Sequence, residues 1–184
     1  MKKVLIPLAQ GCEELEAVTV IDLLRRANIH VVTASLDDKP IQASRNVTLI
    51  ADTTLNQAMH EQYEMIVLPG GLPGATHLQK DERITTLIKT IEKAGGFVAA
   101  ICAAPKILAD LGLLNGKRAT AYPGILDNTC FPDIQLTNQA VEHDGLMITS
   151  RGPGTAIDFA LTLIDILAGK VARDTVDKGL VRNQ

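Results

Sequence analysis

Short runs of β-branched and other apolar residues alternate along this chain with stretches that carry the periodicity of a helix. The runs that we expect to form strands are Lys3–Ala9, Ile29–Ser35, Met65–Leu68, Phe97–Ile101 and Arg118–Ala121. The helical stretches are Glu13–Ala27, Asp81–Ala94, Lys106–Leu111 and Thr155–Gly169, the last with Gly169 as its C′ residue. Strands that alternate with helices are typical of βαβ units, in which a crossover helix makes neighbouring strands parallel.

Two further segments have the pattern of hairpins, one between Ile41 and Ala51 and one between Ala140 and Ser150, where Asp144-Gly145 is a turn dipeptide. We expect both hairpins to add strands to the sheet. The predicted fold class is therefore α/β: a flavodoxin-like, doubly wound, mostly parallel sheet in a three-layer α/β/α sandwich. We assign residues 1–184 to a single domain, because no linker or repeat interrupts them and 46% of them are hydrophobic, enough for one core. The segment Leu180–Gln184 is either a docked tail or a frayed one.

Composition and charge narrow the classes of partner. The chain has 18 Lys and Arg against 21 Asp and Glu, a net charge of −3, and no basic stripe of the kind that nucleic acids or anionic membranes attract. Small molecules or proteins are the expected partners. The first residues do not have the pattern of a signal peptide, and no apolar stretch has the length of a membrane span, so we expect a cytoplasmic protein.

The spacing of the cysteines and histidines argues against a disulfide framework and against a metal site. The three cysteines, Cys12, Cys102 and Cys130, are an odd number at wide spacing, which argues against a disulfide framework and for reduced thiols. The four histidines are isolated from one another, and we expect no metal.

The segment Gly95–Pro105 is the strongest indication of chemistry. Its apolar run is broken at Cys102, and small residues and a proline follow, as where a strand passes into a helix. A cysteine at such a corner projects from the carboxyl end of its strand toward unpaired amides of the next helix, so its thiol should ionise easily. The alternative is a buried, inert cysteine in a turn of small residues.

If the strands Lys3–Ala9, Met65–Leu68 and Phe97–Ile101 are neighbours, the loops that follow them meet in one crevice. The first loop enters a helix with three carboxylates, of which Glu13 and Glu14 suit the helix dipole. Glu16, with Leu15 and Val18, can instead lie near the helix face that meets the sheet, which would direct its carboxyl into the crevice, the alternative being a carboxyl that faces solvent. Beside a thiolate its pKa should rise, so that a protonated carboxyl donates a hydrogen bond to sulfur and takes part in acid/base catalysis.

The second loop, Leu68–Gly74, contains three glycines and two prolines. Its free N–H groups form, with the amide of Ala103, either an oxyanion pocket or part of a tight turn only. It matches no phosphate-binding pattern. The segment Ser150–Thr155 is typical of the start of a helix, and its Arg151 is a candidate anion ligand.

Three other residues have side chains that could act in or near the crevice. His77 is a candidate base, and Cys12 is a candidate resolving thiol for Cys102. Cys130 has no helper nearby and is interpreted as structural.

Four segments together strongly resemble the ThiJ/PfpI superfamily, in the branch of the Parkinson-disease protein deglycase and bacterial YajL. They are Gly11–Glu16, Leu68–Gly71, Ala99–Pro105 and Ser150–Thr155, in the family's order along almost the whole chain. The resemblance implies that Cys102 is the nucleophile and Glu16 its protonated partner. It also implies that Gly71 and Ala103, with Gly70, form the oxyanion site, that Arg45 and Arg26 lie near the site or across a dimer interface, and that the protein is a homodimer.

Two residues depart from the family's patterns. Ala103 stands where the family's peptidases have a histidine after the cysteine, so peptide hydrolysis is not expected. Tyr122 stands where the eukaryotic branch has a histidine, which leaves Glu16 to manage proton transfer with less help.

The resemblance implies a cofactor-independent glyoxalase or deglycase that acts through Cys102 on 2-oxoaldehydes such as methylglyoxal, free or as protein adducts, in defence against oxidative and carbonyl stress. The alternative is a cysteine-based redox sensor or stress chaperone with little turnover. A third hypothesis is a hydrolase for an ester or amide.

Overall fold

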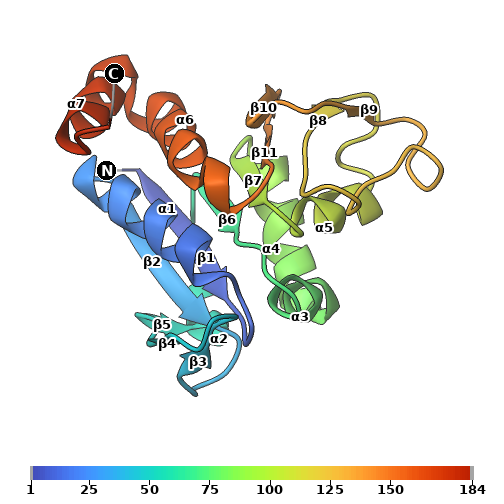
Figure 1. Ribbon diagram of the computed structural model, residues 1–184. Coiled ribbons are helices and arrows are strands. Elements are labelled where there is room, and N and C mark those ends of the chain that lie inside the picture. Colours follow the sequence, from blue (N-terminus) through green and yellow to red (C-terminus); the bar gives the residue numbers. More distant parts are fainter. Residues whose placement is uncertain (1, 183–184) are drawn as a thin grey trace.

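The computed structural model describes residues 2–182 and is organised around one seven-stranded sheet (Figure 1). The strand order is β10-β11-β7-β6-β1-β2-β5, and every pair is parallel except the β10–β11 hairpin. The strands of this sheet are β1 (Lys3–Leu8), β2 (His30–Ser35), β5 (Thr53–Thr54), β6 (Met65–Leu68), β7 (Phe97–Ile101), β10 (Val141–Asp144) and β11 (Met147–Ser150). The order β2-β1-β6-β7-β11 is that of flavodoxin-like folds, so the predicted α/β sandwich is confirmed.

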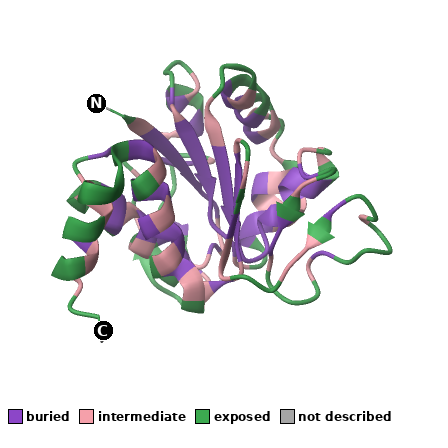
Figure 2. Cartoon of the chain, turned by 90° about the horizontal axis from the view of Figure 1, so that it is seen from above, coloured by how far each residue is buried: buried purple, intermediate pink, exposed green. Residues whose placement is uncertain are grey.

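Helices cover both faces of the sheet (Figure 1). One layer consists of α1 (Glu14–Arg26), α6 (Ala156–Ala168) and α7 (Lys170–Gly179), and the short 3-10 turn η1 (Pro153–Thr155) precedes α6. The other layer contains α2 (Leu55–Ala58), α3 (Gly74–Lys80), α4 (Glu82–Lys93) and α5 (Pro105–Asp110). Each layer buries its own apolar cluster against the sheet, and Figure 2 shows the buried strands between helices whose outer faces are exposed.

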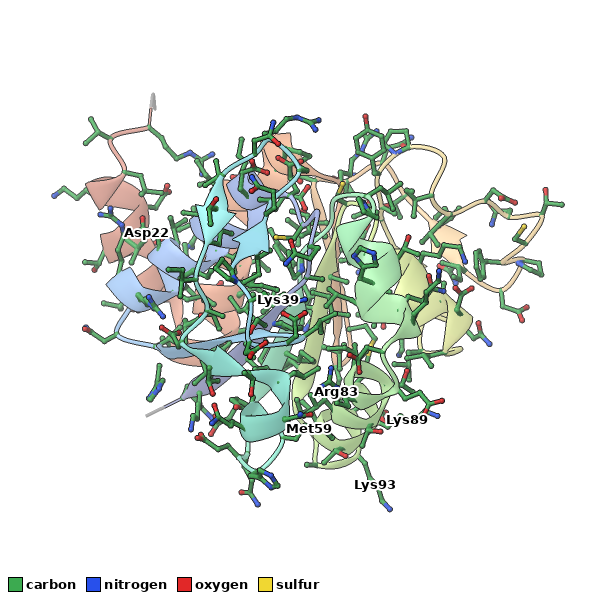
Figure 3. The ribbon with its side chains drawn as sticks, turned by 90° about the horizontal axis from the view of Figure 1, so that it is seen from below. Asp22, Lys39, Met59, Arg83, Lys89 and Lys93 are labelled. Atoms are coloured by element: carbon green, nitrogen blue, oxygen red, sulfur yellow. The ribbon has the colours of Figure 1, made fainter. Side chains whose placement is uncertain are left out.

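Helix α4 illustrates how the sequence periodicity builds these layers. Ile84, Leu87, Ile88 and Ile91 recur at helical spacing and are all buried against the sheet. Lys89 and Lys93 lie on the opposite face and point away from the domain (Figure 3). The helix begins where the side chain of Asp81 accepts a hydrogen bond from the amide of Arg83 at 3.0 Å, which satisfies one of the free N–H groups of its first turn.

The prediction that Arg118–Ala121 adds a strand to the main parallel sheet was wrong. Only β8 (Arg118–Ala119) forms, and it pairs with β9 (Gln135–Leu136) in a separate two-stranded sheet. The position beside β7 is occupied by β11, so the main sheet has no free edge there for β8.

The first predicted hairpin forms but does not join the main sheet. Its strands, β3 (Ile41–Gln42) and β4 (Thr48–Leu49), pair only with each other, because β5 already pairs with β2. The second hairpin, β10–β11, does extend the sheet as expected.

The C-terminal segment is docked as far as Arg182, whose guanidinium lies 2.9 Å from the carboxylate of Asp158 in α6. Residues 183 and 184 of the tail lie outside the described residues. Within residues 2–182 no helix combines the length and the apolar character needed to cross a membrane.

Candidate active site

The candidate site lies at the carboxyl ends of β1, β6 and β7, which are neighbours in the sheet, so the condition for a common crevice is met. The strand order reverses between β1 and β6, and ligands of doubly wound sheets bind in the crevice at such a point. Cys102 follows β7, the glycine loop follows β6, and Glu16 comes from the first turn of α1.

Cys102 occupies the corner between β7 and α5. Its φ angle is +65°, in the left-handed region that a residue with a side chain rarely adopts. Two backbone hydrogen bonds hold it there: its N–H donates to the carbonyl of Ser150 at 3.0 Å, and its carbonyl accepts from the N–H of Tyr122 at 2.9 Å. The surrounding structure therefore fixes a strained backbone at this residue, as happens at functional sites.

The glycine loop fits against this corner because it lacks side chains. A Cβ atom at Gly70 would lie 2.6 Å from the Cβ of Cys102 and 2.8 Å from Oε2 of Glu16. Gly71 has φ of +86°, and a Cβ there would lie 2.4 Å from the amide nitrogen of Glu13. Both positions require glycine, and the approach brings backbone amides to the sulfur.

Glu16 is a fully buried carboxyl beside this thiol. Its Oε2 accepts a hydrogen bond from the amide of Gly70 at 2.9 Å, so this amide holds the carboxyl in position. Its Oε1 has no oxygen or nitrogen partner among residues 2–182. The side chain also forms a hydrogen bond with Cys102. One oxygen is thus anchored and the other is available to bind and release a proton.

Burial raises the pKa of Glu16 to about 7, although the hydrogen bonds with Cys102 and Gly70 lower it in part. Near neutral pH this carboxyl is therefore present in both protonation states, as suits a group that exchanges protons.

The surroundings of the thiol oppose its ionisation, whereas the sequence-based expectation considered only the amides of the next helix. Burial, followed by the charge and hydrogen bond of Glu16, raises the pKa of Cys102 to about 12, while hydrogen bonds from the amides of Gly71 and Ala103 act in the opposite direction. The carboxylate ionises first, and its negative charge then holds the proton on sulfur. A thiolate forms when that proton passes to Glu16, and the two amides stabilise the resulting charge.

A third wall of the site comes from the segment before α6, which the sequence indicated mainly as a helix start. The position that a Cβ would take at Gly152 lies 4.0 Å from Sγ of Cys102 and 3.2 Å from Cδ2 of Tyr122. Gly152 is held by Thr155, whose hydroxyl accepts from the Gly152 amide at 3.1 Å. The glycine itself was the only sequence signal for this close approach.

The two arginines that the resemblance implied do not meet Cys102 in this chain. Arg45 is exposed at the tip of the β3–β4 hairpin, where its amide donates to Oε1 of Glu14 at 2.8 Å. Arg26 pairs with Asp22 at 2.7 Å at the far end of α1. Ten residues of helix separate it from Glu16, a distance of about 15 Å.

The remaining candidates are His77, Cys12 and Cys130. His77 is in α3, where its Nδ1 lies 2.9 Å from the carbonyl of Gln10, and it lines a separate cavity of about 380 Å³. Cys12 is fully buried, and burial, with the charges of nearby carboxylates, raises its pKa to about 11. Cys130 is exposed, and all three cysteines are free thiols. Within residues 2–182 no cluster of three His, Cys, Asp or Glu side chains is arranged to hold a metal ion.

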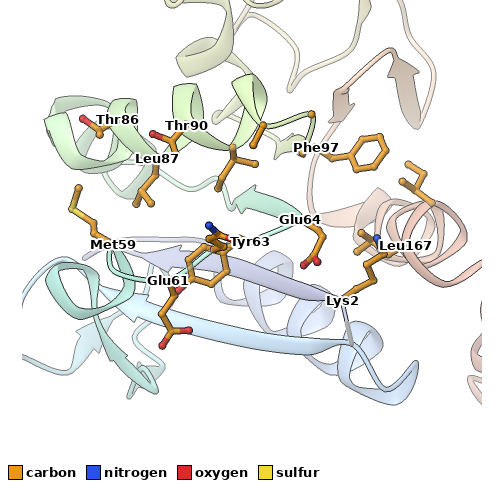
Figure 4. A pocket seen from close by; sticks show the side chains of 16 residues that line it. Lys2, Met59, Glu61, Tyr63, Glu64, Thr86, Leu87, Thr90, Phe97 and Leu167 are labelled. Carbon is orange, nitrogen blue, oxygen red and sulfur yellow. The ribbon is translucent and has the colours of Figure 1, made fainter.

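Another cavity lies at the opposite ends of the strands. It measures about 440 Å³ and is lined by Lys2, Glu64 and Phe97 among others (Figure 4). Phe97 begins β7 and Cys102 follows its end, so the strand separates them by roughly 17 Å. Size alone therefore does not identify the reactive site.

Comparison with known proteins agrees with this geometry. A sequence profile described as "DJ-1/PfpI family" matches residues 2–166. Protein dj-1beta of Drosophila melanogaster is 40% identical over 98% of this chain and 97% of its own length. The Parkinson disease protein 7 homolog of Danio rerio is 42% identical over 91% of this chain and 90% of its own. The glutathione-independent glyoxalase DJR-1.2 of Caenorhabditis elegans is 30% identical over 96% and 94%.

Two solved structures are similar throughout. The crystal structure of Drosophila DJ-1beta has a TM-score of 0.93 with 39% identity, and covers 100% of this chain and 99% of its own. The structure of oxidized Toxoplasma gondii DJ-1 has a TM-score of 0.94 with 38% identity, and each chain is covered completely.

Proposed function

The chain belongs to the DJ-1/PfpI family, in its DJ-1 branch, and from this premise we propose that it is a cofactor-independent glyoxalase or deglycase that acts on 2-oxoaldehydes. The observation that carries the proposal is the pair formed by Cys102 and the buried carboxyl of Glu16, whose Oε1 has no oxygen or nitrogen partner within residues 2–182. A relative that is 30% identical is named a glutathione-independent glyoxalase.

The first step joins the sulfur to the aldehyde carbon of the substrate. Glu16 accepts the thiol proton as the S–C bond forms, and the electron pair of the carbonyl bond moves to the aldehyde oxygen, which then takes the proton from Glu16. The product is a thiohemiacetal, and Glu16 is again a carboxylate. Its pKa of about 7 suits both directions of this transfer.

The second step moves hydrogen between adjacent carbons. Glu16 removes the proton from the carbon attached to sulfur and holds it, and the electron pair moves through the new C=C bond to the neighbouring carbonyl oxygen, giving an enediolate. The amides of Gly71 and Ala103, which hydrogen-bond Cys102, stabilise the negative charge that develops on oxygen.

The last steps release the product. Glu16 returns the proton to the second carbon, and the hydroxyl proton of the first carbon passes to the oxygen of the second. This leaves a thioester at the first carbon and a hydroxyl group at the second, and water then hydrolyses the thioester to a hydroxy acid and the free thiol. One carbon is oxidised and its neighbour reduced, so methylglyoxal plus water gives lactate without an external redox agent.

Lactate formation from methylglyoxal by the wild type, Cys102→Ser and Glu16→Gln tests this function. We expect catalytic turnover by the wild type only, with Glu16→Gln reduced by roughly 10² to 10⁴, the range typical of one acid/base group. A small thiol and the Cys130→Ser variant are the controls for simple scavenging. Stoichiometric uptake without lactate would refute the proposal.

A redox function of the same cysteine is the second candidate. Two equivalents of peroxide, each transferring one oxygen atom and leaving as water, convert the thiol to a sulfinic acid, and the free Oε1 of Glu16 is suited to hydrogen-bond it. One structural relative, the DJ-1 of Toxoplasma gondii, is described as oxidized. Selective gain of two oxygen atoms at Cys102 by intact mass, with no lactate from methylglyoxal, would favour this function.

We also propose that the protein acts as a homodimer in the reducing cytoplasm, where its three free thiols persist. Leu15 and Val18 of α1 and Val47 of the neighbouring hairpin are each about half exposed and form an apolar surface beside Arg45. Sedimentation of the wild type and Val18→Glu tests the contact: the variant should sediment as a monomer, and an unchanged dimer would exclude this surface.

A further inference from the structure

A small chamber shares one residue, Tyr122, with the surroundings of Cys102. It has a volume of about 270 Å³, and its lining includes Tyr122, Leu136, Thr137, Asn138 and Arg151. We name it the Arg151 chamber. It belongs neither to the Cys102–Glu16 pair nor to the glycine loop, and the steps derived above make no use of it.

Tyr122 connects the chamber with the sulfur. Its side chain is half exposed and lines the chamber, while one edge of its ring lies 3.2 Å from the position of a Cβ at Gly152. Sγ of Cys102 lies 4.0 Å from that same position. A substrate whose aldehyde meets the sulfur can therefore extend along the ring of Tyr122 into the chamber.

The charged part of the chamber lining is positive. Arg151 is the only Lys, Arg, Asp or Glu in the lining, and its guanidinium forms no salt bridge with any carboxylate of residues 2–182. Its Nη1 makes a single long contact, 3.4 Å from the carbonyl of Asn138. In a chain whose net charge is −3, a half-buried arginine with most of its donors unused is a site for an anion from outside the protein.

The segments that carry these groups are fixed rather than loose. The amide of Arg151 donates to the carbonyl of Ala140 at 3.3 Å, and the amide of Tyr122 donates to the carbonyl of Cys102 at 2.9 Å. The backbone from which each of these side chains extends is thus fixed, which limits the space that the Arg151 guanidinium can reach.

We propose that the Arg151 chamber is a substrate subsite in which Arg151 binds the anionic end of a 2-oxoaldehyde while its aldehyde carbon reaches Cys102. The preferred substrates are then 2-oxoaldehydes that carry a carboxylate or a phosphate, rather than methylglyoxal itself. This inference rests on the proposed glyoxalase function and adds a specificity to it.

The kinetic test compares substrates that differ in charge. The carboxylate arm compares 4,5-dioxopentanoate with methylglyoxal, and the phosphate arm compares hydroxypyruvaldehyde phosphate with hydroxypyruvaldehyde. In the wild type, kcat/KM should be roughly tenfold or more higher for the anion in at least one arm, the size expected for one charge-assisted pair. Which arm shows the preference identifies the anion.

In Arg151→Gln, kcat/KM for the anionic substrate of the preferred pair should fall to within about twofold of kcat/KM for its neutral counterpart. The value for the neutral substrate should stay nearly the same as in the wild type. Arg151→Lys, which keeps the charge but loses the planar fork, should retain part of the preference. Lys93→Gln removes an equal charge from the exposed face of α4 and should behave as the wild type. Equal kcat/KM values for anionic and neutral substrates in the wild type would overturn the proposal. So would a ratio of these two values in Arg151→Gln that is the same as in the wild type.

A binding measurement separates this inference from the proposed function. Inorganic phosphate and propionate are titrated into the protein, and the amide signals of Gly152 and Thr137 are followed by NMR. Saturable shifts in the wild type that vanish in Arg151→Gln would support the subsite even if no 2-oxoaldehyde were turned over. Absence of such shifts together with absence of an anion preference would refute it.

Discussion

Replacing Glu16 by glutamine should stabilise the protein increasingly as the pH rises. Burial raises the pKa of this carboxyl from 4.5 to about 7, so between these values the folded state binds a proton that the unfolded state has released. The stability contributed by Glu16 therefore falls as the pH rises through this window. Relative to low pH, where Glu16 is protonated in both states, its ionisation lowers the free energy of unfolding by about 1 kcal/mol at pH 5 and about 3 kcal/mol at pH 8.

Glutamine has nearly the same shape, accepts the hydrogen bond of the Gly70 amide and carries no charge, so the variant should lack this pH dependence. Urea denaturation of both proteins at pH 5, 6, 7 and 8, at one protein concentration, gives the difference in the free energy of unfolding directly. We expect that difference to shift in favour of the variant by about 2 kcal/mol across the series. The exposed carboxylate of Glu82 supplies the matched control, Glu82→Gln.

Parallel stability curves for the wild type and Glu16→Gln would refute the reasoning, because they would mean that Glu16 ionises alike in both states. A difference that moved in the opposite direction would indicate a carboxylate stabilised by the site, and the proposed proton transfers would lose their basis. The measurement stays below the pH range in which Cys102 ionises, whose pKa is raised to about 12.

Three further predictions concern the fold around the site. Gly70→Ala, whose Cβ would lie 2.6 Å from that of Cys102, should cost about 1 to 3 kcal/mol of stability by overpacking and abolish turnover; urea melts and lactate assays check this, and a fully active, equally stable variant would contradict it. Asp52→Asn should cost about 1 kcal/mol at neutral pH, because the half-exposed carboxylate accepts hydrogen bonds from the amide and hydroxyl of Thr33 at 2.9 and 2.8 Å. Burial raises the pKa of Asp52, but these hydrogen bonds outweigh it and lower the pKa overall. The wild type and Asp52→Asn should therefore become equally stable in urea as the pH falls through that pKa, and a difference in the free energy of unfolding that stays constant with pH would contradict this account. Phe159→Ala should cost about 3 to 5 kcal/mol, since this fully buried ring fills the core between α6 and the sheet; a loss below 1 kcal/mol in calorimetry would mean that the core collapses around the gap.

The fold class and the pairing of Cys102 with Glu16 could be predicted from the amino-acid sequence alone. Periodicity reports which side of each element is buried, and that local signal was sufficient for β1, α1, β6, α4, β7 and α6. A cysteine at a strand end and a carboxylate one turn into a helix then met because the strands before them are neighbours. The glycines of the loop Leu68–Gly74 left an oxyanion pocket and a tight turn as alternatives, and the resemblance to a family favoured the pocket.

Only the tertiary structure decided the pairing of the short strands and the electrostatics of the site. Residues 118–121 have an apolar pattern that fits either sheet, and the choice depended on which edge β11 had already taken. The pKa of Cys102 depends on burial and on the charge of Glu16, contributions that come from distant segments and outweigh the amides at the corner. The approach of Tyr122 to Gly152 beside the sulfur, and the presence of Arg151 in the same chamber as Tyr122, likewise follow from the packing of two loops, which local sequence periodicity does not record.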